Sequence, residues 1–182
     1  NLLNGDLLSK HSARRSELFQ ALMKRQECQD IFIQYLIELM NGAFSYENYC
    51  YLIDTMHESR KAEAELFVTT SRFRRGSMWG IESTLERLRS FAQNRPKHLY
   101  RTELRQAFKT SGKTYTISIT APENAYIMAG HWKIDKEFTG TYIREYGEEF
   151  EIFPAVGYEF SHWIVNGETP VYDCVLSLDY ED

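Results

Sequence analysis

The sequence lacks the features that mark several large classes of protein. No run approaches the roughly 18 apolar residues that span a membrane, because the longest candidate, 31–37, is followed by Glu38 and Asn41-Gly42. No basic segment followed by an apolar one opens the chain, so no signal peptide is predicted. The chain opens at Asn1 rather than at methionine, and we therefore expect a piece of a longer protein.

Cysteine is also scarce, with Cys28, Cys50 and Cys174 as the only examples. An odd number of cysteines without a Cys-x-x-Cys spacing argues against a disulfide framework and against a structural zinc site. Cys28 and Cys50 fall in helical patterns, where a free cysteine most often acts as a small buried apolar residue.

Catalytic signatures are absent as well. The sequence contains no Walker loop, no G-x-G-x-x-G, no H-E-x-x-H and no G-x-S-x-G. Asp54 and His57 stand three residues apart and can meet on one helix face, but a metal site needs further ligands there. The chain is therefore predicted to hold no catalytic, cofactor-binding or metal-binding residue of its own.

Charge is divided unevenly along the chain. Residues 1–112 hold 17 lysines and arginines against 13 aspartates and glutamates, whereas residues 113–182 hold 4 against 13. Such asymmetry favours two units with different surfaces. The small basic excess of the first unit is spread among acidic residues, which differs from the clustered basic face of a nucleic-acid-binding protein.

The first unit has the periodicity of helices. Between residues 16 and 40, apolar residues recur at intervals of three and four, the spacing of one helix face. Asn41-Gly42 is predicted to end that helix, through a residue that tolerates a left-handed backbone, and Ser45 to cap the next. Pro96 is predicted to separate two helices, because its ring does not fit a helix interior.

After Gly112 the period changes to two. Apolar residues alternate with threonine and serine over residues 114–120, the pattern of a half-buried strand. Asn166-Gly167 predicts a hairpin turn. Trp163 is predicted to be buried, with a β-bulge at Ser161-His162 that returns it to the core side of its strand. Further strands are expected at residues 127–134, 141–146, 149–153, 158–165 and 171–178.

The fold class is therefore predicted to be α+β. An all-helical N-terminal segment, residues 1–112, precedes a small antiparallel β domain, residues 113–182, built as a sandwich or an open barrel. The change of period and the change of charge both fall at this boundary.

Two sets of residues are candidates for a ligand surface. Aromatic side chains on a sheet can hold sugars or peptides, and Trp132 and Tyr142 are candidates of this kind, although a small domain also needs such side chains to fill its core. Arg72, Arg74 and Arg75 form a basic cluster in a predicted loop before a helix, where arginines can hold phosphate or simply face solvent.

Several short segments of the chain have an order and spacing that are typical of one protein family. Residues 88–96 read Leu-Arg-Ser-Phe-Ala-Gln-Asn-Arg-Pro, Trp79 stands ahead of them, and Phe32-Ile33, residues 39–44 and Ile53-Asp54 lie upstream. In order and spacing these segments resemble the C-terminal region of bacterial CotH-like (spore coat protein H) kinase domains, over about residues 16–109. The stretch from Phe153 to Trp163 is similar to the sheet modules that often trail this domain.

The resemblance implies a parent that is an atypical protein kinase using ATP and magnesium, acting on surface or coat proteins outside the cell. The catalytic and metal-binding aspartates of that family lie upstream, near a W-D-x-D type motif that this chain lacks. We therefore expect the chain to be a non-catalytic C-terminal portion without a cofactor. Two alternatives stay open: a surface module that binds a glycan or peptide, and a structural coat or cell-surface component. Nucleic acid and a membrane are not expected as partners.

Overall fold

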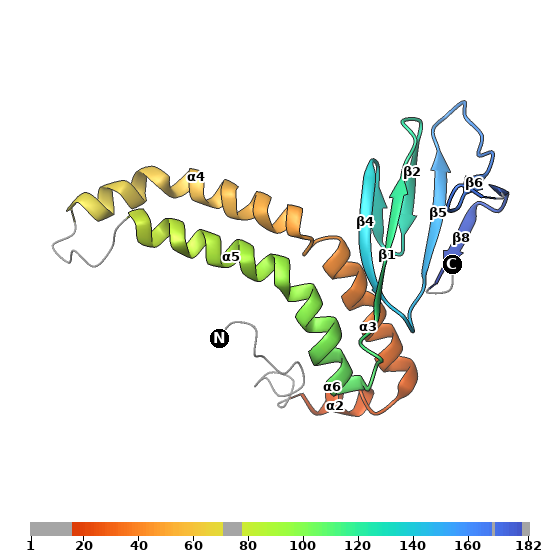
Figure 1. Ribbon diagram of the computed structural model, residues 1–182, viewed down its shortest axis with the longest axis horizontal. Helices are drawn as coiled ribbons and strands as arrows, with labels where there is room; N and C mark the ends of the chain where they lie inside the picture. The colour runs from red at the N-terminus through yellow and green to blue at the C-terminus, as the bar shows by residue number, and fades with distance from the viewer. Residues whose placement is uncertain (1–15, 71–77, 169, 180–182) are drawn as a thin grey trace.

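The computed structural model describes residues 16–70, 78–168 and 170–179. Helices come first and antiparallel strands follow, so the chain has an α+β fold with a helical N-terminal part and a small β domain, as predicted (Figure 1). The described helices are α2 (Glu17–Leu22), α3 (Gln26–Asn41), α4 (Tyr46–Thr70), α5 (Met78–His98), the π-helix η1 (Leu99–Leu104) and α6 (Arg105–Phe108).

The strands form three antiparallel sheets and, among the described residues, no closed barrel. One sheet has the order β1-β4, the second has the order β3-β2-β5-β8, and the third pairs β6 with β7. The strands are β1 (Thr114–Thr120), β2 (Ala125–Ala129), β3 (Trp132–Ile134), β4 (Glu137–Ile143), β5 (Glu148–Pro154), β6 (Trp163–Ile164), β7 (Pro170–Val171) and β8 (Val175–Leu178).

The segment predicted as one helix over residues 16–40 is two helices. Ser16 is the N-cap of α2, and its side-chain oxygen accepts a hydrogen bond from the Phe19 N–H at 3.1 Å. The chain then turns after Met23, and Gln29 of α3 donates its side-chain N–H to the Met23 carbonyl at 2.7 Å. In a continuous helix the Met23 carbonyl would accept a backbone hydrogen bond. Here the Gln29 side chain supplies that bond instead, which stabilises the break between α2 and α3.

The predicted stop at Asn41-Gly42 and the predicted cap at Ser45 are both confirmed. Helix α3 ends at Asn41, and the Ser45 hydroxyl accepts a hydrogen bond from the Asn48 N–H at 3.4 Å at the start of α4. The reason for the glycine differs from the prediction, because φ at Gly42 is −102°, outside the left-handed region. A Cβ there would lie 2.6 Å from the Trp132 ring, so close packing requires the glycine.

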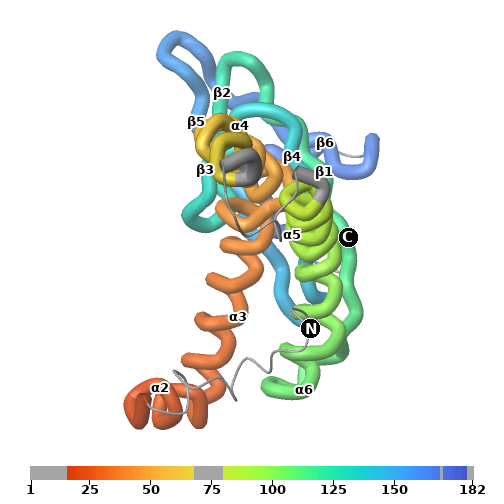
Figure 2. Tube along the Cα trace, turned by 90° about the vertical axis from the view of Figure 1, so that its left-hand side faces the viewer, coloured from red at the N-terminus to blue at the C-terminus, as the bar shows by residue number. Residues whose placement is uncertain are grey.

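Helices α4 and α5 form a long antiparallel hairpin that extends away from the sheets (Figure 1), and Figure 2 shows the two helices nearly end-on. At the end nearer the sheets, the rings of Tyr49 and Phe91 pack with centroids 6.4 Å apart. The Arg89 guanidinium pairs with Asp54 across the same interface. The hairpin therefore joins its helices by an apolar contact and an ion pair on adjacent turns.

The predicted helix break at Pro96 is wrong. Helix α5 runs through Pro96 to His98 and continues directly into η1. The π-helical turns begin at Leu99, three residues beyond the proline, and such turns are rare and occur mostly as short interruptions of an α-helix. Pro96 still removes one amide donor, but the chain keeps its helical course.

A buried ion pair spans this irregular stretch. Glu103 is only 3% exposed. Each of its two carboxylate oxygens accepts a hydrogen bond from the Arg95 guanidinium, and the longer of these two bonds measures 3.0 Å. His98 lies 3.6 Å from the same carboxylate. Bidentate pairing of this kind is the strong form of an ion pair. It therefore ties the last turn of α5 to η1.

The change from helix to strand falls at Gly112 as predicted, between α6 and β1. Buried residues of both parts nevertheless belong to one core, in which Ile33, Ile37 and Leu104 of the helices lie with Tyr142 and Phe150 of the sheets. The two predicted domains, 1–112 and 113–182, therefore share a core, and expression of residues 113–182 alone tests whether they fold independently.

A polar stripe on α3 attaches that helix to the β domain. Its members are Asp30, Gln34, Glu38 and Asn41, spaced so that they share one helix face. Asn41 illustrates the contact, because its side chain donates to the Thr141 carbonyl at 3.1 Å and accepts from the Thr141 N–H at 2.8 Å. These bonds cover the outer edge of β4.

The end of the chain departs from the predicted strands in part. Within residues 158–165 only Trp163–Ile164 is a strand, so no strand exists in which the predicted bulge could form. Burial of Trp163 is confirmed at 8% exposed, with its indole N–H donated to the Asp173 carbonyl at 2.9 Å. The turn is also confirmed, since φ is +52° at Asn166 and +75° at Gly167.

A candidate acidic binding cleft

The residues predicted to form a ligand surface are not brought together. Tyr142 is 1% exposed, so it belongs to the core and is closed to a surface ligand. Trp132 is half-buried because it packs against Gly42 at the end of α3. Arg72, Arg74 and Arg75 lie outside the described residues.

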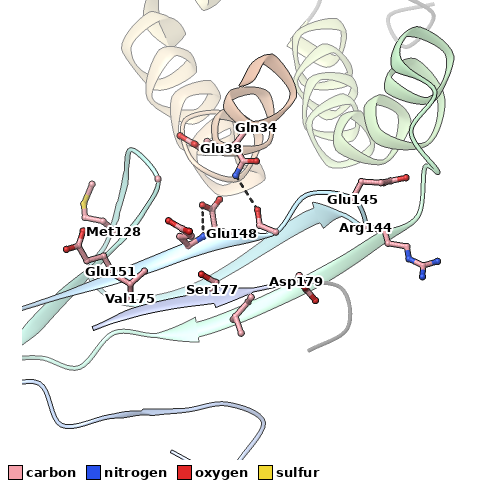
Figure 3. Close-up of a pocket in the computed structure, with 14 residues that line it drawn as sticks. Gln34, Glu38, Met128, Arg144, Glu145, Glu148, Glu151, Val175, Ser177 and Asp179 are labelled. Carbon is pink, nitrogen blue, oxygen red and sulfur yellow. Dashed lines mark hydrogen bonds between the residues drawn. The ribbon is translucent and has the colours of Figure 1, made fainter. Parts of the chain in front are cut away.

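A cleft of about 750 Å³ lies between α3 and the strands β5 and β8. In Figure 3, α3 carries Gln34 and Glu38 on one side, and the strands carry Glu148 and Ser177 on the other. One arginine, Arg144, lines the cleft. Six carboxylates of the described residues line it: Glu38, Glu145, Glu148, Glu149, Glu151 and Asp179.

Glu148 is the unusual member because it occupies a core-facing position. Burial alternates along the start of β5, where Glu148 and Phe150 are buried and Glu149 and Glu151 are exposed. Alternation in a strand places every second side chain on the same face. Glu148 therefore points to the side of the sheet that α3 covers and is only 5% exposed.

The Glu148 carboxylate has little to compensate its burial. Among the described residues it accepts one hydrogen bond, from the adjacent Glu149 N–H at 3.1 Å, and it forms no ion pair. Burial, with a smaller effect from the nearby charges of Glu38 and Glu149, raises the pKa of Glu148 to about 7. The carboxyl group can thus gain or lose a proton near neutral pH.

Glu38 is held in place by the turn between β2 and β3. Its carboxylate accepts a hydrogen bond from the His131 N–H at 3.3 Å and lies 3.0 Å from the ring Nδ1 of the same residue. The Tyr35 ring stacks on His131 with centroids 5.0 Å apart. Gly130 has φ of +53°, and a Cβ there would meet the Glu38 carboxylate at 2.6 Å. The turn therefore needs glycine for both its backbone and its contact.

Gln34 and Glu145 complete the frame of the cleft. Gln34 donates its side-chain N–H to the Gly147 carbonyl at 3.2 Å, which joins α3 to the turn before β5. The Glu145 carboxylate accepts a hydrogen bond from the Ser111 N–H. Two walls of the cleft are thus fixed by bonds between segments far apart in the sequence.

The arrangement suits a cationic ligand. The described part of the chain contains no group of three or more histidine, cysteine, aspartate or glutamate side chains placed to hold a metal ion. A single ammonium or guanidinium group needs no such convergence, because it can bond one carboxylate and be attracted by the others at longer range.

The chain matches no family model, no curated protein and no solved structure. The fold and the cleft are therefore interpreted from their own chemistry. Among the helices that the structure describes, none combines the length and apolar character needed to span a bilayer.

The sequence held a partial signal for this cleft. Five of its six carboxylates come from residues 113–182, the segment with 13 acidic residues against 4 basic ones. The sixth, Glu38, comes from a helix more than 100 positions away from Glu148. Charge counting could indicate an acidic unit, but only the packing of α3 on the sheet shows where the carboxylates gather.

Proposed function

We propose that this chain is a binding segment whose acidic cleft takes a lysine or arginine side chain of a protein partner. The observation that carries the proposal is Glu148, a carboxylate that is 5% exposed and forms no ion pair among the described residues. A buried carboxylate is destabilised until a counter-charge or a proton arrives. A cationic side chain entering the cleft supplies that charge.

The surrounding charges favour such a partner over others. Five further carboxylates line the same cleft, so its field attracts cations and repels phosphate-bearing ligands. A lysine or arginine side chain also carries an apolar stem, which Met128 and Val175 at the cleft wall can contact. The cleft therefore fits a basic segment of a protein better than a nucleic acid.

A fluorescently labelled tetralysine peptide provides the test, with tetraglutamate as the negative control. Three proteins are compared at pH 8: the unaltered chain, Glu148→Gln and Glu123→Gln. Glu123 is an exposed carboxylate that does not line the cleft, so both variants lose the same net charge. General electrostatic attraction therefore falls equally in the two variants.

We expect Glu148→Gln to weaken tetralysine binding at least about 10-fold, equivalent to roughly 1.4 kcal/mol. Glu123→Gln should change the affinity less than about 2-fold. Binding to the unaltered protein should also strengthen from pH 6 to pH 8, as Glu148 loses its proton. Equal effects of the two substitutions would show that the peptide is held by overall charge, and would reject the cleft as its site.

A second proposal keeps the CotH-like interpretation, in which the chain is the C-terminal, non-catalytic part of an atypical protein kinase. Large apolar side chains exposed on the helices favour a further packed neighbour. On α3 these are Ile31, Tyr35 and Leu39, one turn apart on one face. On α4 they include Leu52 and Met56.

Magnesium-dependent ATP turnover separates the two proposals. The isolated chain should show none under either, whereas a longer polypeptide carrying the upstream kinase segment should show it under the CotH-like proposal alone. A glycan-binding surface stays an alternative, for which the exposed aromatic residues of the β domain are Tyr158 and Tyr172.

A further inference from the structure

The outer edge of β1 has features that go beyond the acidic cleft. Among the strands that the structure describes, β1 stands at the end of its two-stranded sheet and pairs only with β4. Its seven residues, Thr114–Thr120, include no charged residue and no proline, and they pair with β4 in an unbroken register without a bulge. Charged residues, prolines and β-bulges commonly protect an edge strand from pairing with another chain. Strand β1 has none of the three and is therefore an unprotected edge.

The direction of the free backbone groups follows from the pairing. Lys113 and Arg144 are bonded across the two strands, as are Ala121 and Lys136, each at 3.0 Å. In an antiparallel pair the bonded residues alternate with residues whose N–H and C=O point outward.

The odd-numbered residues of β1 therefore face β4, and the even-numbered ones face away. Thr116 and Ser118 are the central even-numbered residues, and their backbone groups have no partner among the described residues. Thr141, opposite Thr116, confirms the parity, because its outward groups bond Asn41 of α3 instead.

A crevice of about 290 Å³ runs beside this edge. One wall is β1, and the facing wall comes from β6, the turn after it and β8. Its apolar lining includes Ile117 of β1, Trp163 and Val165, and Leu176 of β8. Strand β8 is also the last strand of its own sheet, so two sheet edges border the same crevice.

We infer that the crevice is a peptide-binding site in which an extended, uncharged segment of a partner protein adds to β1 as a further strand. Backbone groups at Thr116 and Ser118 supply the main-chain hydrogen bonds of such strand addition. Apolar side chains at every second position of the guest enter the crevice. Among the described residues that line the crevice, Asp179 alone is charged and the others are apolar or neutral polar, which favours an uncharged guest.

A single guest strand fits the site better than a second copy of this chain. The wall formed by Trp163–Asn166 stands opposite the edge of β1. A partner sheet that approached β1 edge to edge would bring its own second strand into that wall. One extended chain requires only the space beside the edge.

The test uses a labelled heptapeptide of alternating threonine and valine, followed by fluorescence anisotropy. Ser118→Pro removes an outward N–H without touching the bonds to β4, because Ser118 is an even-numbered residue. Ser118→Ala is the matched control: it keeps the N–H and loses only the hydroxyl contact with Thr139 at 3.2 Å. A second peptide, N-methylated at alternate residues, blocks pairing without altering the protein.

We expect binding to fall at least about 10-fold with Ser118→Pro and with the methylated peptide, and to be unchanged with Ser118→Ala and with Glu123→Gln, an exposed site outside the crevice. The amides of Thr116 and Ser118 should exchange with solvent in the free protein and become protected when peptide binds. Full affinity for the methylated peptide would overturn the inference. Protection of these amides without peptide, in step with dimer formation, would equally overturn it and assign the edge to a second copy.

Discussion

Replacing Glu148 by glutamine should stabilise the protein at neutral and alkaline pH. The group's pKa rises from 4.5 to about 7 on folding, so the folded protein binds this proton more tightly than the unfolded chain does. At about 1.4 kcal/mol per tenfold change in proton affinity, the difference corresponds to roughly 3 kcal/mol. Ionised Glu148 therefore destabilises the fold by that amount above pH 7.

The pH window follows from the same shift. Below about pH 4.5 the carboxyl is protonated in both states and resembles glutamine, so the two proteins should be nearly equal in stability. Between pH 4.5 and 7 the unfolded chain has lost the proton and the folded protein still holds it. The advantage of Glu148→Gln should grow through this interval and level off above pH 7.

Urea unfolding at pH 4.5, 6, 7 and 8, followed by tryptophan fluorescence, measures the effect. Glu148 is faced by Glu38 from α3, by Glu149 on its own strand and by Tyr142 from β4. These groups are unchanged in the variant, so the difference between the proteins isolates Glu148. Glu123→Gln, at an exposed site, should shift stability by less than about 0.5 kcal/mol. Parallel pH curves for Glu148→Gln and the unaltered protein would refute the reasoning.

Three further changes test the fold. Trp163→Ala should lower the free energy of unfolding by about 3–5 kcal/mol, because it empties a core position and leaves the Asp173 carbonyl without its donor. An unchanged urea midpoint would show that Trp163 does not contribute to the core. Glu103→Leu should lower the free energy of unfolding by about 3 kcal/mol because it leaves Arg95 unpaired. Adding Arg95→Met should recover part of that loss, and a double variant less stable than Glu103→Leu alone would contradict a buried pair. Residues 113–182 expressed alone should lack a cooperative thermal transition, because α3 supplies part of their core; a sharp transition would instead support independent units divided at Gly112.

Local features of the sequence determined the elements of this protein. The change of hydrophobic period placed the switch from helix to strand, and β1 was predicted with its exact bounds, 114–120. The Asn-Gly turn at residues 166–167 followed from the positive φ that both residues tolerate. These predictions succeeded because each depends on residues within a few positions of one another.

Only the tertiary structure decided how those elements are used. Pro96 lies inside α5 although local propensity disfavours a proline there, and the neighbouring Arg95 pairs with Glu103 of η1. In the sequence, Glu148 is one more charged residue of an acidic strand. In the structure, α3 covers its carboxylate and shields it from water. Burial depends on which distant segment packs on a given face, and a single sequence carries no direct record of that choice.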